Sequence, residues 1–176
     1  YDVDSARAAA AGGATDIVGR IAFQKVGEQM NQQFIVDNRG GGGGTLGASV
    51  VAKSPADGYT LMVYSATFIV NAHIYRKLPY DPLKDVATVS RVGGSQLVLV
   101  VHPSVAAKSV GDLVALANAK PGSINFASAG LGSTAHLAGE YLKHLAKIDI
   151  VHVPYKGAGP ALTDLMGGQV QMLISG

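Results

Sequence analysis

The architecture of this chain follows from one segment, Phe126-Ala127-Ser128-Ala129-Gly130-Leu131-Gly132-Ser133-Thr134-Ala135-His136. An apolar run ends near Ala127, two glycines allow a tight turn, and a helical pattern begins beyond Ser133, a good N-cap residue. A strand, a glycine turn and a helix N-terminus together form the geometry in which free N–H groups and the helix dipole bind an anion. The same spacing also fits an ordinary capped helix start, so both interpretations stand at this point.

The composition limits the class of protein. A chain of 176 residues that is 48% hydrophobic can bury a core, as one large domain or two small ones. The formal net charge is only +2 and tryptophan is absent, which argues against a nucleic-acid partner. There is no cysteine, so disulfides and thiol chemistry are excluded. No apolar run reaches the roughly 20 residues of a membrane span, so we expect no direct membrane insertion.

Helical and extended patterns alternate along the chain, which predicts an α/β fold with largely parallel sheets. Ligands bind beyond the carboxyl ends of the strands in such sheets. Helices are predicted over 15–30, 45–53, 68–78, 109–119, 133–145 and 160–166, and strands over 34–36, 59–64, 97–101, 124–127, 148–153 and 170–174.

Capping signals refine the helix starts. Thr15 is predicted to cap the first helix, with Asp16 favourable in its first turn. Ser109 and Asp112 match a capping box with an Asp variant. The opening residues 1–11 are alanine-rich and weakly patterned, so we predict no strand there, and we expect that a leader has been removed before residue 1.

A run of glycines over 40–44 suggests nucleotide binding. Gly42, Gly44 and Gly47 fit the dinucleotide pattern G-x-G-x-x-G. The next strand should then end in an acidic residue for the ribose, but it ends at Tyr64-Ser65. We therefore disfavour a nucleotide and expect no cofactor.

Ser133 and His136 raise the alternative of a hydrolase-like α/β enzyme. The nucleophile elbow G-x-S-x-G is absent, and an acid is still needed to orient His136. Asp149 and Asp164 are the candidates by sequence. The five histidines show no metal-ligand spacing, so we expect no metal site.

Small loops rich in N–H groups remain at four predicted strand ends: 12–15, 65–67, 128–134 and 155–159. None contains arginine, so backbone amides and hydroxyls must satisfy any bound anion. Such loops suit a small carboxylate that is held reversibly, and binding fits them better than catalysis.

Several motifs together resemble the Bug-type receptors, the periplasmic solute-binding components of tripartite tricarboxylate transporters. The resemblance runs in order from about Gly12 to Ile174. It rests on Gly12-Gly13-Ala14-Thr15-Asp16-Ile17, Val36-Asp37-Asn38-Arg39, Ala56-Asp57-Gly58-Tyr59-Thr60-Leu61, Leu78-Pro79-Tyr80-Asp81-Pro82, Phe126 to Ser133, and Val151-His152-Val153-Pro154-Tyr155-Lys156-Gly157.

The resemblance implies a periplasmic-binding-protein-like fold, a type II Venus flytrap with two lobes that close on a small carboxylate or related polar solute. It implies no catalysis, a periplasmic location and membrane components of the transporter as partners. The residues expected to bind the ligand lie in the strand-end loops: Gly13, Ala14, Thr15, Asp16, Ser65, Ala66, Thr67, Ser128, Ala129, Gly130, Gly132, Ser133, Thr134 and Tyr155.

Two departures from the family pattern shape the remaining expectations. Family chains open with an apolar strand ending in proline, which residues 1–11 lack. They are also longer, so we expect the first lobe at 1–91, the second lobe at 92–176, and the return segment of the first lobe beyond this sequence. A ligand-sensing module without transport is a further alternative, because fold does not fix function.

Overall fold

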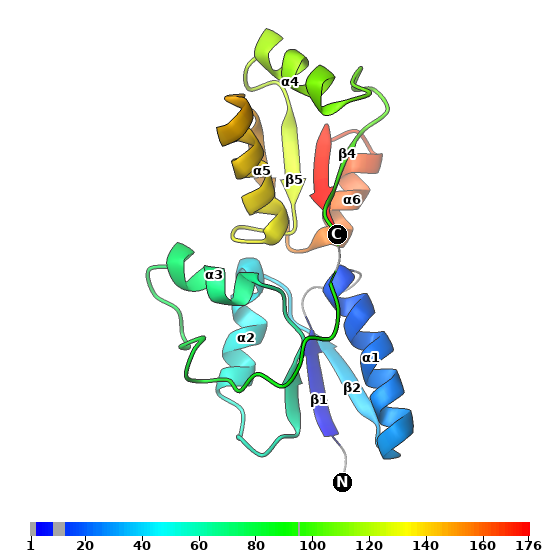
Figure 1. Ribbon diagram of the computed structural model, residues 1–176, viewed down its shortest axis with the longest axis vertical. Helices are drawn as coiled ribbons and strands as arrows, with labels where there is room; N and C mark the ends of the chain where they lie inside the picture. Colours follow the sequence, from blue (N-terminus) through cyan, green and yellow to red (C-terminus); the bar gives the residue numbers. More distant parts are fainter. Residues whose placement is uncertain (1–2, 9–12, 95) are drawn as a thin grey trace. The chain divides into compact units, whose positions relative to one another are not determined.

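The computed structural model describes residues 3–8, 13–94 and 96–176. The chain divides into two compact units, Tyr1–Ser95 and Gln96–Gly176 (Figure 1). Residues 1, 2 and 9–11, and Gly12 of the first predicted loop, lie outside the described residues. Each unit combines strands with helices, so the predicted α/β class is confirmed.

The first unit is built on a three-stranded parallel sheet in the order β2-β1-β3. Its elements are β1 (Val3–Ala8), α1 (Ala14–Met30), β2 (Phe34–Asn38), the 3-10 turn η1 (Gly42–Gly44), α2 (Thr45–Ala52), β3 (Thr60–Met62) and α3 (Thr67–Ile74). Helix α1 approaches the sheet closely, because a Cβ at Gly19 would lie 3.3 Å from Val63 Cγ2. A separate core cluster forms around Ala48, Phe68 and Tyr80.

Strand β1 corrects the expectation that the opening residues form no strand. Val3–Ala8 is the central strand of this sheet and pairs in parallel with β2 and β3. Its sequence has little strand propensity of its own. Backbone pairing on both edges decides its conformation, which is a tertiary effect that overrides local preference.

The second unit contains a four-stranded sheet in the order β4-β7-β5-β6. Strands β5, β6 and β7 are parallel, and β4 is antiparallel to β7. The elements are β4 (Val98–Val101), α4 (Val110–Ala119), β5 (Asn125–Ser128), α5 (Thr134–Ala146), β6 (Val151–Pro154), α6 (Ala158–Met166) and β7 (Met172–Ser175).

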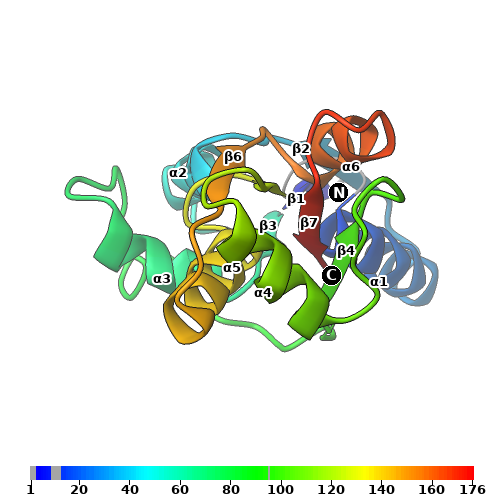
Figure 2. The same cartoon turned by 90° about the horizontal axis from the view of Figure 1, so that it is seen from above.

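Helices cover both faces of this second sheet (Figure 2). One core cluster joins Leu113 of α4 and Ala135 of α5 to Phe126 and Met172 of the sheet. The other joins Leu165 of α6 to Ala127 and Leu173. Neighbouring strand residues enter opposite clusters, as the alternation of side chains along a strand requires. The carboxyl ends of β5 and β6 lie at the same edge of the sheet, because the two strands pair in parallel with Ser128 opposite Pro154.

Candidate functional site

Hydrogen bonds within the turn after β5 fix its conformation. Ser128 is fully buried, and its Oγ lies 3.2 Å from both the N–H and the carbonyl oxygen of Gly130. Gly130 (φ +129°) and Gly132 (φ +76°) adopt backbone conformations that favour glycine. The Ser133 N–H closes the turn by donating to the Gly130 carbonyl at 3.1 Å. The glycines predicted from the sequence are thus required by the conformation of the turn.

Helix α5 begins directly behind this turn. Ser133 is its N-cap, and Ser133 Oγ accepts from the His136 N–H at 3.2 Å, which confirms the predicted cap. The Gly132 N–H donates to His136 Nδ1, also at 3.2 Å. Among the hydrogen bonds of the described residues, none uses the N–H groups of Thr134 and Ala135. These two donors lie at the positive end of the helix dipole, where an anion is favoured.

The loop after β6 lies beside this turn, because β5 and β6 pair in parallel with Ser128 opposite Pro154. The Tyr155 N–H donates to the Ser128 carbonyl at 3.0 Å. The Tyr155 hydroxyl donates to Asp164 Oδ2 at 2.6 Å, and this bond raises the pKa of the phenol to about 12. Tyr155 is therefore a neutral group that ties the two predicted loops together.

Two histidine rings lie under the turn, and sequence reasoning missed the second of them. The rings of His136 and His152 stack with centroids 4.1 Å apart, and His152 also packs on Phe126 at 4.8 Å. His152 Nε2 lies 2.6 Å from Ser128 Oγ. Residues 126 and 152 are register partners, so the pairing of β5 with β6 could have revealed this contact.

Both rings are held neutral. Burial lowers the pKa of His152 to about 4, with His136 adding to the shift. Burial also lowers the pKa of His136, and Lys143 acts in the same direction while Glu140 opposes it. In addition, His136 Nδ1 must carry a lone pair, because it accepts the Gly132 N–H. The two rings beneath the turn therefore carry no charge of their own.

The residues that the enzyme alternative requires either make other hydrogen bonds or are exposed. Ser133 Oγ caps the helix and His136 Nδ1 accepts a backbone N–H. The carboxylate of Asp164 binds Tyr155, and Asp149 is exposed. The structure therefore supports binding rather than nucleophilic chemistry at this turn.

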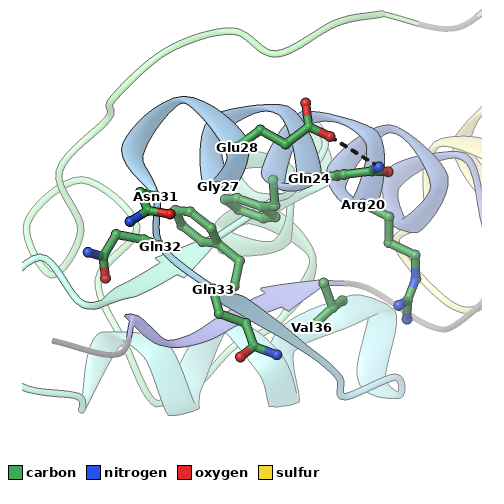
Figure 3. Close-up of a pocket in the computed structure, with 10 residues that line it drawn as sticks. Arg20, Gln24, Gly27, Glu28, Asn31, Gln32, Gln33 and Val36 are labelled. Carbon is green, nitrogen blue, oxygen red and sulfur yellow. Dashed lines mark hydrogen bonds between the residues drawn. The ribbon is translucent and has the colours of Figure 1, made fainter.

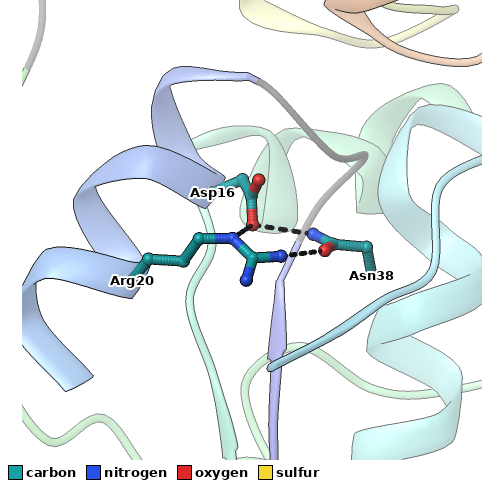
Figure 4. Close-up of polar contacts among 3 residues, drawn as sticks. All are labelled: Asp16, Arg20 and Asn38. Atoms are coloured by element: carbon teal, nitrogen blue, oxygen red, sulfur yellow. Dashed lines mark hydrogen bonds and ion pairs between the residues drawn. The ribbon is translucent and has the colours of Figure 1, made fainter. Parts of the chain in front are cut away.

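The start of α1 is built differently. Helix α1 begins at Ala14 with Gly13 as N-cap and without a side-chain capping bond, so the prediction of Thr15 as the cap is wrong. Asp16 is buried, and its Oδ1 accepts from Arg20 Nε and Asn38 Nδ2, both at 2.9 Å (Figure 4). Arg20 Nη2 also donates to Asn38 Oδ1 at 2.6 Å. The carboxylate thus joins the helix to the end of β2.

The remaining predicted site residues lie before and at the start of α3. Ser65 Oγ and Thr67 Oγ1 are 2.6 Å apart, and the Phe68 N–H donates to the Ser65 carbonyl at 3.0 Å. Thr67 is buried and Ala66 is exposed. These contacts order the loop that the sequence singled out.

The glycine run has a packing role in the first unit. Tyr64 Oη and Asn71 Nδ2 donate to the Gly43 carbonyl at 2.6 and 3.1 Å. Gly44 has φ +88°, and a Cβ there would overlap the Tyr64 hydroxyl. Burial raises the pKa of that hydroxyl above its ordinary range. Positive φ angles over 41–44 and the contact of Gly44 with Tyr64 therefore explain the glycines of this run.

A hollow of about 640 Å³ lies elsewhere in the first unit, between α1 and β2. Figure 3 shows its polar rim, where Gln24 Nε2 lies 3.4 Å from Glu28 Oε1. Phe23 and Phe34 stack in its wall with centroids 5.1 Å apart. Its lining includes none of the predicted site residues, and it does not contain a helix N-terminus that could hold an anion.

Metal-binding clusters and membrane-spanning helices are absent from the described residues. No group of three or more His, Asp or Glu side chains among them could hold a metal ion. None of the helices in the described part of the chain has the length and apolar character needed to cross a membrane.

Helix starts at the carboxyl ends of parallel strands are where α/β folds bind ligands, and solved periplasmic binding proteins share this fold, which places the chain in the periplasmic-binding-protein class. The chain belongs to one family of that class, because residues 18–176 match the tripartite tricarboxylate transporter family receptor. The resemblance found in the sequence motifs is thereby confirmed, and members of this family are receptors rather than enzymes.

Individual relatives agree with this assignment. Protein BugT of Bordetella pertussis is 41% identical over 90% of this chain and 49% of its own length. A solved structure of a periplasmic transporter is 37% identical with a TM-score of 0.93, covering 99% of this chain and 60% of that one. MatC from Rhodopseudomonas palustris with bound malate is 29% identical with a TM-score of 0.86, covering 99% and 61%. The chain spans about half the length of the curated relatives it matches.

Proposed function

We propose that this chain is part of a periplasmic receptor that captures a small carboxylate for a tripartite tricarboxylate transporter. The observation that carries the proposal is the start of α5, where Thr134 and Ala135 offer N–H groups free of partners among the described hydrogen bonds. Support comes from the family and from MatC, which is solved with malate. The solute would pass to membrane components of the transporter.

The predicted binding residues fall into two sets, one in each unit. In the second unit, Ser128 and Tyr155 order the loops, and the turn formed by Ala129, Gly130, Gly132 and Ser133 leads to the proposed N–H donors at the start of α5. Each hydrogen bond to a charged carboxylate contributes about 1.5–3 kcal/mol. In the first unit, the proposed binding residues are those of Gly13–Asp16 and Ser65–Thr67.

The sharpest test removes the Thr134 N–H from the start of α5. Proline is tolerated at the first helical position, and Ser133 has φ −65° and ψ 155°, which suits a residue before proline. Thr134→Pro therefore deletes a proposed donor while α5 still forms. Titration calorimetry with malate, benzoate and neutral nicotinamide would identify the solute class. Affinity for the carboxylate should fall about 10- to 100-fold in the variant.

Val110→Pro is the matched control. Val110 is the first residue of α4, behind Ser109 in an equally extended conformation (φ −144°, ψ 164°). This variant also places a proline at the first helical position, but at the start of α4 instead of α5. It should bind carboxylates as the wild type does. Equal affinity in Thr134→Pro and the wild type would refute the proposed site.

A further inference from the structure

The second unit contains two helix starts with the same hydrogen-bond pattern and different charge. In α4, Ser109 Oγ accepts from the Asp112 N–H at 3.1 Å, and Asp112 Oδ2 accepts from the Lys108 N–H at 3.0 Å. In α5, Ser133 Oγ accepts from the His136 N–H, and His136 Nδ1 accepts from the Gly132 N–H. In both helices, the side chain of the third helical residue accepts a hydrogen bond from the backbone N–H of the residue before the N-cap.

The two acceptors differ in their effect on the helix dipole. Bonds from the Lys108 N–H and from Ser109 hold the pKa of Asp112 below its usual range, so α4 carries a negative charge in its first turn. The first turn of α5 contains no acidic residue. The one acidic side chain of α5, Glu140, lies in the second turn and pairs with Lys143 at 3.1 Å. The positive end of the α5 dipole is therefore uncompensated by its own cap.

We propose that His136 is a specificity-determining residue, a neutral capping acceptor that keeps the start of α5 uncharged so that a carboxylate binds there. The inference rests on the proposed function. It makes the His136 side chain the reason that this site selects an anionic solute. A carboxylate at position 136 would make the same hydrogen bond, as Asp112 does, and would repel the solute. His152 acts through His136 as a positioning residue, because its ring stacks on His136 and contacts Ser128.

The test compares His136→Asp with His136→Asn, two side chains of the same shape that both lose the ring stack and differ only in charge. At pH 7 the Asp variant should bind malate about 100-fold more weakly than the Asn variant, since like charges then lie within one helical turn. Asp112→Asn, which makes the same chemical change at the start of α4, should leave malate affinity unchanged. Equal affinity in the two His136 variants would overturn the inference.

A second measurement needs no ligand. An aspartate in the first turn is favoured by the helix dipole, so His136→Asp should melt roughly 2–5 °C above His136→Asn at pH 7. The difference should shrink as the pH falls through the lowered pKa of the introduced carboxyl group, and vanish once that group is protonated. Equal melting temperatures at pH 7 would overturn the inference even if the wild type bound no carboxylate. A wild type that fails to bind the panel, with the melting difference intact, would instead refute the proposed function alone.

Discussion

Helix α1 carries a buried carboxylate, Asp16, as its third residue, whereas α5 carries a neutral imidazole, His136, at the same position. The carboxylate of α1 is balanced within the protein by Arg20 and Asn38. The α5 start has a serine cap, stacked rings and no charge of its own. The two helix starts thus differ in what they leave for a ligand. The start of α1 already pairs with a carboxylate of the protein, and the start of α5 does not.

Removal of the internal anion should have the largest effect. Asp16→Ala leaves Arg20 and Asn38 without their shared acceptor and should lower the free energy of unfolding by about 2–3 kcal/mol. Hydrogen exchange of the α1 amides would report the loss locally. Thr15→Ala at the neighbouring position is the control, and it should change stability by less than about 0.5 kcal/mol because Thr15 is not the cap. If Thr15→Ala lowered the stability as much as Asp16→Ala does, the Asp16–Arg20–Asn38 network would not be the source of that stability.

Close packing under the α5 turn should give the next largest effect. A Cβ at Gly139 would overlap the buried ring of Phe126, on which His152 packs. Gly139→Ala should therefore destabilise by about 1–3 kcal/mol through overpacking. Gly111→Ala in α4 is the matched control, because its nearest contact would be Ser109 Oγ at an ordinary 3.6 Å. That control should stabilise slightly, by up to about 1 kcal/mol, as alanine is the better helix former. Chemical denaturation would measure both, and a neutral Gly139→Ala would rule out the tight contact.

Acidification should have the smallest effect on stability, and it should weaken the region around α5 more than that around α1. His152 binds a proton in the unfolded chain near pH 6.5 but in the folded chain only near pH 4. Its contribution to stability is thus complete above pH 6.5 and is lost as the pH falls toward 4. His136, Glu140 and Lys143 of α5 and Ser128 of β5 are the groups around it, and His136 shifts in the same direction. We expect a loss of roughly 1–2 kcal/mol, allowing for partial exposure of the rings.

The control for this pH dependence is His152→Phe, which keeps an aromatic ring against Phe126 without a titrating nitrogen. Its unfolding free energy should vary less between pH 6.5 and 4 than that of the wild type. Hydrogen exchange at each pH should show the weakening in α5 and β6 rather than in α1. A variant with the same pH slope as the wild type would assign the effect to other groups.

Local chemistry made part of this structure predictable. The β5 strand end, the glycine turn and the Ser133 cap follow from neighbouring residues, and so does the Ser109–Asp112 box. The family motifs identified the receptor class. These features were accessible because each depends on contacts within a few residues of sequence.

The features that the sequence did not reveal depend on distant partners. Strand β1 is specified by its pairing with β2 and β3, which residues 3–8 do not encode locally. The contact of His152 with Ser128 requires the register of β5 with β6, over a separation of 24 residues. The Asp16 network needs Asn38 from the end of β2, 22 residues away. In each case an acceptor or a strand finds its partner only after the sheet has formed.

The placement of β7 has a consequence for the order of assembly of the second unit. β7 comes last of its strands along the chain, yet it lies between β4 and β5 and pairs with both. The antiparallel pair joins Val98 to Ser175, so a loop of most of the unit must close before β4 gains a neighbour. Contacts so far apart in sequence form slowly. The β5–turn–α5 segment depends on local contacts, whereas the sheet around it is complete only once β7 pairs with both β4 and β5.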